Sequence, residues 1–139
     1  MKTIVQHYGA DLDWIESFSE NFEGKVSGNF INIPDSIHTG DKYFLKCGEG
    51  IVALYADITY HIDFRLIHKN FTNDFVGLYY NLSEGEVRMT YEENCFNVGP
   101  WAYNLFLIDS SLEYQYDVVA GSKCFVLVIF IKKETINVN

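Results

Sequence analysis

Histidine determines which metal and acid–base chemistry this sequence can support, and the chain has four: His7, His38, His61 and His68. Two histidines on one strand bind the same metal ion when they stand two residues apart, because alternate side chains share a face. No pair has that spacing, and His61 and His68 fall on opposite faces of a common strand because their separation is odd. The sequence therefore predicts no metal site. His68, at the end of its strand and in phase with apolar residues, is the histidine that we expect beside a pocket.

Cysteine and serine offer no better candidate for a nucleophile. The three cysteines, Cys47, Cys95 and Cys124, include no CxxC pair, and the chain has no GxSxG motif. Cys95 follows Glu92-Glu93, whose negative charge disfavours the reactive thiolate, while Cys47 and Cys124 lie in apolar stretches typical of a core. The glycines stand singly at turns, without a phosphate-binding loop. We therefore expect no catalytic residues, no cofactor and no enzymatic activity.

Aromatic side chains make up 17% of the chain, more than a core of this size needs. Tyrosine and tryptophan join a large apolar ring to a polar tip, which suits the wall of a small-molecule pocket. The alternative is that these rings fill a β-sandwich core. Placed on or beside predicted strands, the candidate ligand-binding residues are Tyr55, His68, Tyr79, Trp101 and Tyr103. Trp101, after Gly99-Pro100, and Tyr79, beside Gly77, are the preferred candidates.

The spacing of apolar residues indicates the scaffold that positions these side chains. Leu12, Ile15, Phe18 and Phe22 recur at helical spacing, which predicts one short helix over residues 11–22 with Asp11 as its N-cap. From residue 29 onward apolar residues alternate instead, with turn sequences between the runs. This pattern predicts strands over residues 28–33, 43–47, 51–58, 61–68, 75–81, 86–91, 103–108, 112–118 and 122–131.

Eight or nine short strands predict an all-β sandwich or barrel, since a long meander must fold over to bury its apolar face. The last strand, Cys124–Ile131, is apolar on both faces. A strand of this kind is covered twice, once by the facing sheet and once from outside. The outer cover is the N-terminal helix, a domain absent from this chain, or a second copy of the protein.

Length and charge limit the function classes further. The 139 residues suit one domain, and the net charge of -9 with a pI near 4.7 repels a phosphate backbone, so we expect no nucleic-acid binding by these residues. The longest apolar run is far shorter than the roughly 20 residues that span a bilayer, and the N-terminus has no apolar signal segment. These features favour a cytoplasmic protein that does not insert into membranes.

Two groups of motifs carry a resemblance to a known family. The first group is Ile31-Asn32-Ile33-Pro34-Asp35-Ser36, Gly40, Lys46-Cys47-Gly48-Glu49-Gly50, Tyr55-Ala56-Asp57-Ile58-Thr59-Tyr60 and Asp63-Phe64. The second group is Gly99-Pro100-Trp101-Ala102-Tyr103-Asn104-Leu105-Phe106-Leu107 and Ala120-Gly121-Ser122-Lys123. Together they resemble the N-terminal effector domain of AraC-type transcriptional regulators, in the Bacteroidetes-like branch. The resemblance implies a cupin-like double-stranded β-helix, or jelly roll, over residues 28–131, with an N-terminal helical segment at 1–27 and the start of a linker at 132–139.

The same resemblance implies a function. Domains of this family bind a small-molecule effector and mediate homodimerisation, while DNA contact comes from C-terminal helix-turn-helix motifs that are absent from this chain. Enzymatic cupins carry two histidines and a glutamate for a metal, and this sequence lacks the HxH pair. We expect an effector-sensing and dimerisation domain; the alternative is a stand-alone small cupin enzyme or a protein that binds a sugar or small acid.

Overall fold

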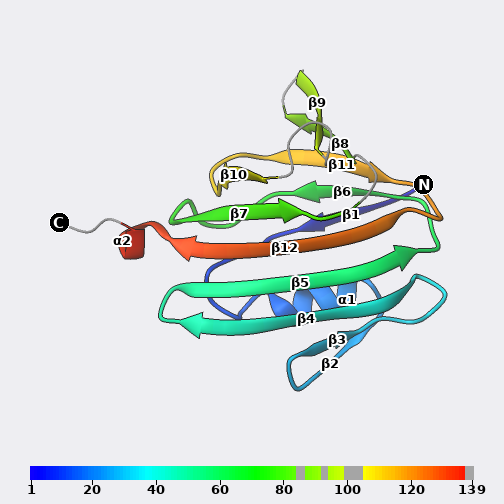
Figure 1. Ribbon diagram of the computed structural model, residues 1–139, viewed down its shortest axis with the longest axis horizontal. Coiled ribbons are helices and arrows are strands. Elements are labelled where there is room, and N and C mark those ends of the chain that lie inside the picture. Colours follow the sequence, from blue (N-terminus) through cyan, green and yellow to red (C-terminus); the bar gives the residue numbers. More distant parts are fainter. Residues whose placement is uncertain (84–86, 92–93, 99–104, 137–139) are drawn as a thin grey trace.

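The chain forms two facing β-sheets with one helix packed beside them (Figure 1). The computed structural model describes residues 1–83, 87–91, 94–98 and 105–136. The strands are β1 (Lys2–Gln6), β2 (Lys25–Ser27), β3 (Phe30–Asn32), β4 (His38–Gly48), β5 (Ile51–Tyr60), β6 (Phe64–His68), β7 (Phe75–Asn81), β8 (Val87–Tyr91), β9 (Asn94–Val98), β10 (Leu105–Asp109), β11 (Tyr114–Val118) and β12 (Lys123–Lys132); the helices are α1 (Ile15–Asn21) and α2 (Lys133–Ile136). The all-β prediction is confirmed. Within the described residues, no helix is long and apolar enough to cross a membrane.

The sheets have the alternating connectivity of a jelly roll. One has the strand order β1-β6-β11-β8-β9 and the other β10-β7-β12-β5-β4-β3-β2. The paired strands run antiparallel except β1, which is parallel to β6. From β5 to β12 the chain crosses repeatedly between the two sheets, so the apolar face of each sheet is buried against the other.

β12 is an interior strand of the seven-stranded sheet, because one of its edges is paired with β5 and the other with β7. Successive side chains of a strand point to opposite faces. The even-numbered residues from Cys124 to Phe130 face the interior, and the odd-numbered residues from Phe125 to Ile131 face away from it. α1 packs on the interior side, where Phe18 meets the same cavity as Val128, so the N-terminal helix is not the outer cover of this strand.

α1 covers the interior next to β1, where the five-stranded sheet ends (Figure 1). Ile15, Phe18 and Phe22 are buried as the helical spacing predicts, whereas Leu12 precedes the helix and is 38% exposed. The helix is shorter than residues 11–22, because the Trp14 indole Nε1 donates to the Gly9 carbonyl at 2.9 Å and holds the preceding segment in a loop. Trp14 takes the N-cap, so the prediction for Asp11 is wrong: its carboxylate lies 3.2 Å from the Lys132 ammonium instead.

β1 is the main element that the sequence analysis does not predict. Its inward positions are Ile4 and Gln6, and the polar Gln6 hides the apolar alternation. Gln6 is nevertheless fully buried, because its amide donates to the His7 carbonyl at 2.7 Å and accepts from Asn21 of α1 at 2.6 Å. β1 therefore joins residues 1–27 to the five-stranded sheet. The short strands β2 and β9 and the single-turn helix α2 are also missing from the prediction, whereas β7 has the predicted bounds.

We expect Gly40→Ala to destabilise the fold by about 2 kcal/mol or more, because two separate costs combine. Gly40 has φ +106 inside β4, and a Cβ there would overlap the carbonyl oxygen of Asp57 in the paired strand β5. Gly121 is the matched control: its φ is +93, but a Cβ would enter open space, so Gly121→Ala carries only the backbone cost. Urea denaturation measures both free energies of unfolding, and an equal loss in the two variants would contradict the clash.

Candidate functional site

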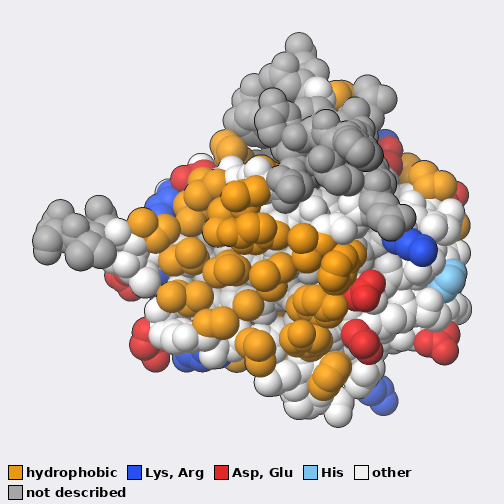
Figure 2. Space-filling model, viewed as in Figure 1, with side chains coloured by type: hydrophobic (Ala, Val, Ile, Leu, Met, Phe, Trp, Pro, Cys, Tyr) orange, Lys and Arg blue, Asp and Glu red, His pale blue; other side chains and the backbone are white. Residues whose placement is uncertain are grey.

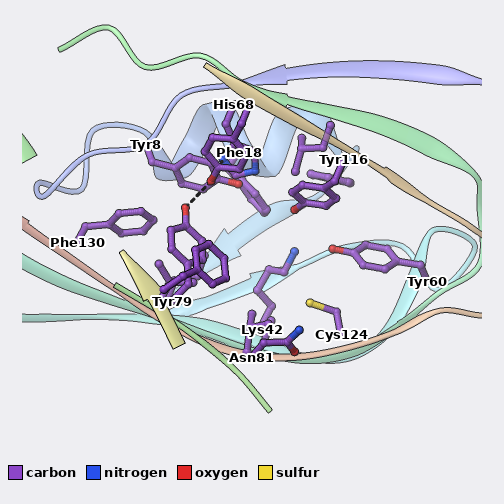
Figure 3. A pocket seen from close by; sticks show the side chains of 18 residues that line it. Tyr8, Phe18, Lys42, Tyr60, His68, Tyr79, Asn81, Tyr116, Cys124 and Phe130 are labelled. Carbon is purple, nitrogen blue, oxygen red and sulfur yellow. Dashed lines mark hydrogen bonds between the residues drawn. The ribbon is translucent and has the colours of Figure 1, made fainter. Parts of the chain in front are cut away.

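A cavity of about 110 Å³ lies between the two sheets and is covered by α1 (Figure 3). Apolar and aromatic side chains make up most of its wall. Its lining residues are Tyr8, Phe18, Phe22, Lys42, Leu54, Ala56, Tyr60, Leu66, His68, Tyr79, Asn81, Phe106, Tyr114, Tyr116, Cys124, Val126, Val128 and Phe130. An apolar space with a few inward polar groups is the usual form of a small-molecule site.

Three polar side chains form a hydrogen-bonded chain that joins the two sheets across the cavity. The hydroxyls of Tyr79 and Tyr114 lie 2.8 Å apart, and the Tyr114 hydroxyl lies 2.9 Å from His68 Nδ1. The His68 ring is also stacked between Tyr114 and Tyr8, with centroid distances of 4.2 and 4.8 Å. Stacking and hydrogen bonding together fix the orientation of this imidazole, while its Nε2 is buried without a hydrogen-bond partner.

Burial lowers the pKa of His68 to about 3, so the imidazole is neutral near pH 7. A neutral imidazole carries one proton, on one of its two nitrogens. If Nδ1 accepts from Tyr114, Nε2 is an unused donor; if Nδ1 donates, Nε2 is an unused acceptor. In both tautomers His68 presents one unsatisfied polar atom in the interior.

Lys42 is the charged residue of the cavity wall. It lies on β4 in the inward phase of the strand, and only 4% of it is exposed. Its Nζ lies 4.4 Å from the centroid of the Phe18 ring and 5.2 Å from that of Phe22, within cation–π range. No ion pair within the described part of the chain involves Lys42, and burial lowers the pKa of its ammonium to about 8.

Phenol groups supply the remaining polar surface. Tyr8, Tyr60 and Tyr116 line the cavity, and among the described residues their hydroxyls form no hydrogen bond. Burial raises the pKa of each of these tyrosines well above its ordinary value, so all three are neutral donors over the working pH range. Burial likewise raises the pKa of the Cys124 thiol to about 11, which leaves it protonated and poorly nucleophilic.

The sequence-predicted site residues divide into three groups. His68 and Tyr79 line the cavity together. Tyr55 lies on the opposite face of β5, where it stacks on Tyr43 at a centroid distance of 4.7 Å and does not reach the cavity. Trp101 and Tyr103 fall in residues 99–104, outside the described residues.

Sequence analysis misses the most distinctive group of the site, Lys42. The signal was its position in the strand. Lys42 shares the buried face of β4 with His38 and Phe44, because residues an even number of positions apart on a strand point to the same side. A lysine in the buried phase of an otherwise apolar strand is unusual, since an isolated buried charge is costly.

The described lining does not fit a metal centre of the kind found in enzymatic cupins. It contains one imidazole, His68, and no carboxylate, and the Nδ1 of that imidazole already faces Tyr114. Elsewhere in the described residues, no group of three or more His, Cys, Asp or Glu side chains is placed to bind a metal ion. The described lining offers hydrogen-bonding groups and one positive charge.

Comparison with known proteins identifies the fold. No protein-family profile and no curated protein matches this sequence. The chain is similar in structure to a cupin protein from Bacteroides fragilis, with a TM-score of 0.53 and 15% identity over 70% of this chain and 81% of that chain. It is also similar to an HTH_3 family transcriptional regulator from Vibrio cholerae, with a TM-score of 0.53 and 15% identity over 82% of this chain and 63% of that chain. The cupin-like jelly roll is thus confirmed.

The same comparison corrects the expectation that the chain is not an enzyme. Similar structures include KdgF from Halomonas sp., with a TM-score of 0.50 and 7% identity over 77% of this chain and 89% of that chain. Because one fold hosts enzymes and binding proteins alike, the lack of a familiar catalytic motif does not exclude catalysis.

We expect the fold to lose stability below pH 6.5 because of its buried histidines. Burial lowers the pKa of His68 to about 3 and that of His38 to about 4, so between these values and 6.5 the unfolded chain binds protons that the folded chain does not. The free energy of unfolding then falls by about 1.4 kcal/mol per pH unit for each histidine. His68→Gln should make this dependence shallower, whereas His7→Gln should leave it unchanged, because His7 stacks on the exposed Phe71, away from both buried histidines. Denaturation between pH 7 and 5 tests this, and equal slopes in all three proteins would contradict it.

Proposed function

We propose that this chain is the small-molecule effector-binding domain of an AraC-type transcriptional regulator. The observation that carries the proposal is the cavity, whose mostly apolar wall also presents the unpartnered His68 Nε2 and the ammonium of Lys42, which has no ion pair within the described residues. Its volume, about 110 Å³, is close to the roughly 150 Å³ of a dry engineered cavity that admits benzene. The cavity therefore suits a compact organic molecule.

The acidic charge supports a division of labour in such a regulator. With a net charge of -9, these residues are poorly suited to contact DNA, and a basic partner domain would supply that contact. The similarity to a transcriptional regulator from Vibrio cholerae, which extends over 63% of that chain, is compatible with this role by analogy of fold.

A second functional surface covers the outer face of the seven-stranded sheet. Apolar side chains form a continuous patch there, which Figure 2 shows in orange. The strand register aligns its rows: Tyr43, Tyr55, Leu127, Tyr80 and Leu105 form one, and Leu45, Ala53, Ile129, Leu78 and Leu107 form the next. Leu45 is 45% and Leu107 62% exposed. A patch of this extent on a sheet is typical of an interface.

We further propose that a second copy of this chain covers the outer apolar patch. Five strands about 4.8 Å apart, each contributing about 20 Å of length, give a flat area of about 500 Å². Two copies face to face would bury about 1,000 Å² before side-chain relief is counted, which reaches the lower limit of a specific interface. The charged residues of this face lie at its two ends, with Asp41, Asp57 and Lys123 at one end and Asp109 at the other, so two copies can approach over an uncharged centre.

β12 connects the two surfaces. Its even-numbered side chains line the cavity and its odd-numbered side chains belong to the patch. A ligand that moves the even-numbered, inward side chains of β12 therefore acts on the strand at the centre of the proposed dimer surface. Effector binding and dimer geometry would be coupled in this way, by a free energy shared between two sites.

Filling the cavity should abolish binding. Ala56 lines the cavity on β5, and Ala53 on the same strand faces outward. We expect benzene and isovaleramide to perturb the NMR methyl signals of Val128 and Leu54 in the native protein. Ala56→Leu should weaken binding at least about tenfold, because three added carbon atoms occupy the space, and Ala53→Leu should not. If neither probe binds, or if Ala56→Leu binds as well as the native protein, the cavity is not the ligand site; a probe recovered chemically changed would indicate an enzyme instead.

Charging the outer patch should separate the dimer. At micromolar concentrations we expect sedimentation to give twice the chain mass of 16.1 kDa for the native protein and a single chain mass for Leu45→Glu/Leu107→Glu. The added carboxylates would be desolvated and would face each other across the two-fold axis. Val119→Glu is the control, because Val119 is 63% exposed but lies in the turn before β12, outside the patch. A monomeric native protein, or a dimer that survives the double substitution, would rule out this interface.

A further inference from the structure

We infer that the ligand of the cavity is a short-chain monocarboxylate whose carboxylate group binds the ammonium of Lys42. This inference rests on the proposed function and names the ligand class of the same site. It follows from the charge of the cavity, the position of the lysine and the donors around it.

The position of Lys42 is the first step. Its side chain extends from the inner face of β4 into the cavity, and Figure 3 shows its nitrogen in the open space between the sheets. Aromatic rings surround the nitrogen: the centroids of Phe18, Phe22 and Tyr60 lie 4.4, 5.2 and 6.0 Å away. Each of these rings stabilises a cation by about 0.5–2 kcal/mol. This gain is less than the free-energy cost of removing an ammonium from water.

The second step is the missing counter-charge. None of the described lining residues is Asp or Glu, and no described carboxylate lies within ion-pair distance of Lys42. A buried charge is normally paired, and truncating one partner of a pair leaves a strongly unfavourable site. An anionic ligand supplies the missing partner. One ammonium balances one negative charge, so a monoanion fits, whereas a dianion such as a phosphate ester would bring an uncompensated charge into the interior.

Neutral donors complete the anion site. The Tyr60 and Tyr116 hydroxyls point toward the part of the cavity where the Lys42 nitrogen lies (Figure 3). Burial raises the pKa of both tyrosines well above the ordinary value, so both keep their protons and can donate to a carboxylate oxygen. A carboxylate accepts about four hydrogen bonds, which one ammonium and two phenols can largely satisfy.

The rest of the wall determines the body of the ligand. Leu54, Leu66, Val126 and Val128 surround the space with hydrocarbon, which favours an apolar chain over a sugar. The volume of about 110 Å³ limits that chain to about the size of benzene. A branched or linear acid with a short hydrocarbon chain meets both conditions.

A matched pair of probes tests the inference. Isovalerate and isovaleramide have nearly the same shape, but only isovalerate is charged. By calorimetry at pH 7 we expect the native protein to bind isovalerate at least about tenfold more tightly, as charge-assisted hydrogen bonds require. Lys42→Met keeps the length of the side chain without its charge and should remove the preference. Lys46→Met is the control, since Lys46 lies on the same strand, is exposed and pairs with Glu49 at 3.7 Å.

A second measurement needs no variant. Burial holds the pKa of Lys42 at about 8, so at pH 8.5 a large fraction of its side chains is neutral, and a bound carboxylate would favour the protonated form. Isovalerate binding should then take up protons, which calorimetry in buffers of different ionisation enthalpy detects. The titratable groups that face Lys42 are Tyr60, Tyr116, Cys124 and His38. Burial raises the pKa of both tyrosines well above the ordinary value and that of Cys124 to about 11, and it lowers the pKa of His38 to about 4, so none of them exchanges protons at this pH.

The outcomes separate this inference from the proposed function. If the native protein binds the acid and the amide equally, or if Lys42→Met keeps the preference, or if no proton is taken up, the carboxylate inference is wrong while ligand binding in the cavity stands. If isovalerate, isovaleramide and benzene all fail to bind, the proposed function itself fails.

Discussion

The pairing of β12 between β5 and β7 is the constraint on which the rest of this structure depends. Both edges of the strand are hydrogen-bonded over most of its length, which fixes its register on each side. In a strand, a shift by one residue would exchange the two faces. The register therefore decides that Cys124, Val126, Val128 and Phe130 form a cavity wall, and it places the alternate residues on the outer patch. β12 is apolar on both faces because each face belongs to an apolar surface. Its inner side chains line the cavity, and its outer side chains belong to the outer patch.

The cavity wall holds polar groups that the fold leaves available. The buried Lys42 has no ion-pair partner within the described residues, and the buried His68 Nε2 has no hydrogen-bond partner there. Gln6 shows the usual alternative, because its buried amide is hydrogen-bonded on both sides. Ser19 Oγ and both ring nitrogens of His38 are also buried without a partner within the described residues, but these residues do not line the cavity. Each such group costs free energy, and those on the cavity wall are the ones that a bound molecule could satisfy.

The sequence analysis predicts the fold better than the site, for a physical reason. Alternation and turn residues locate most strands, and β7 matches its predicted bounds, because burial of one sheet face imposes a period of two on the sequence. β5 shows where this signal ends. Tyr55 and Tyr60 lie on one strand of which both faces carry apolar or aromatic residues, so its periodicity does not say which face is inside. Tyr60 faces the cavity and Tyr55 the outer patch. That choice depends on pairing between strands far apart in sequence.

The two faces of the seven-stranded sheet also explain how a buried event can reach the surface. A ligand that neutralises Lys42 acts first on β4 and on the rings of α1 that pack around the ammonium. β4 pairs with β5 along almost its whole length, and β5 pairs with β12. A displacement of β4 would therefore move β5 and β12 with it, and these strands carry the outer patch. A hydrogen-bonded sheet transmits such a displacement as a rigid element, because its strands cannot slip singly without exchanging faces. On the proposed binding, the unpaired lysine makes the unliganded protein the less stable state, and an anion would stabilise whichever arrangement of the sheet holds it best.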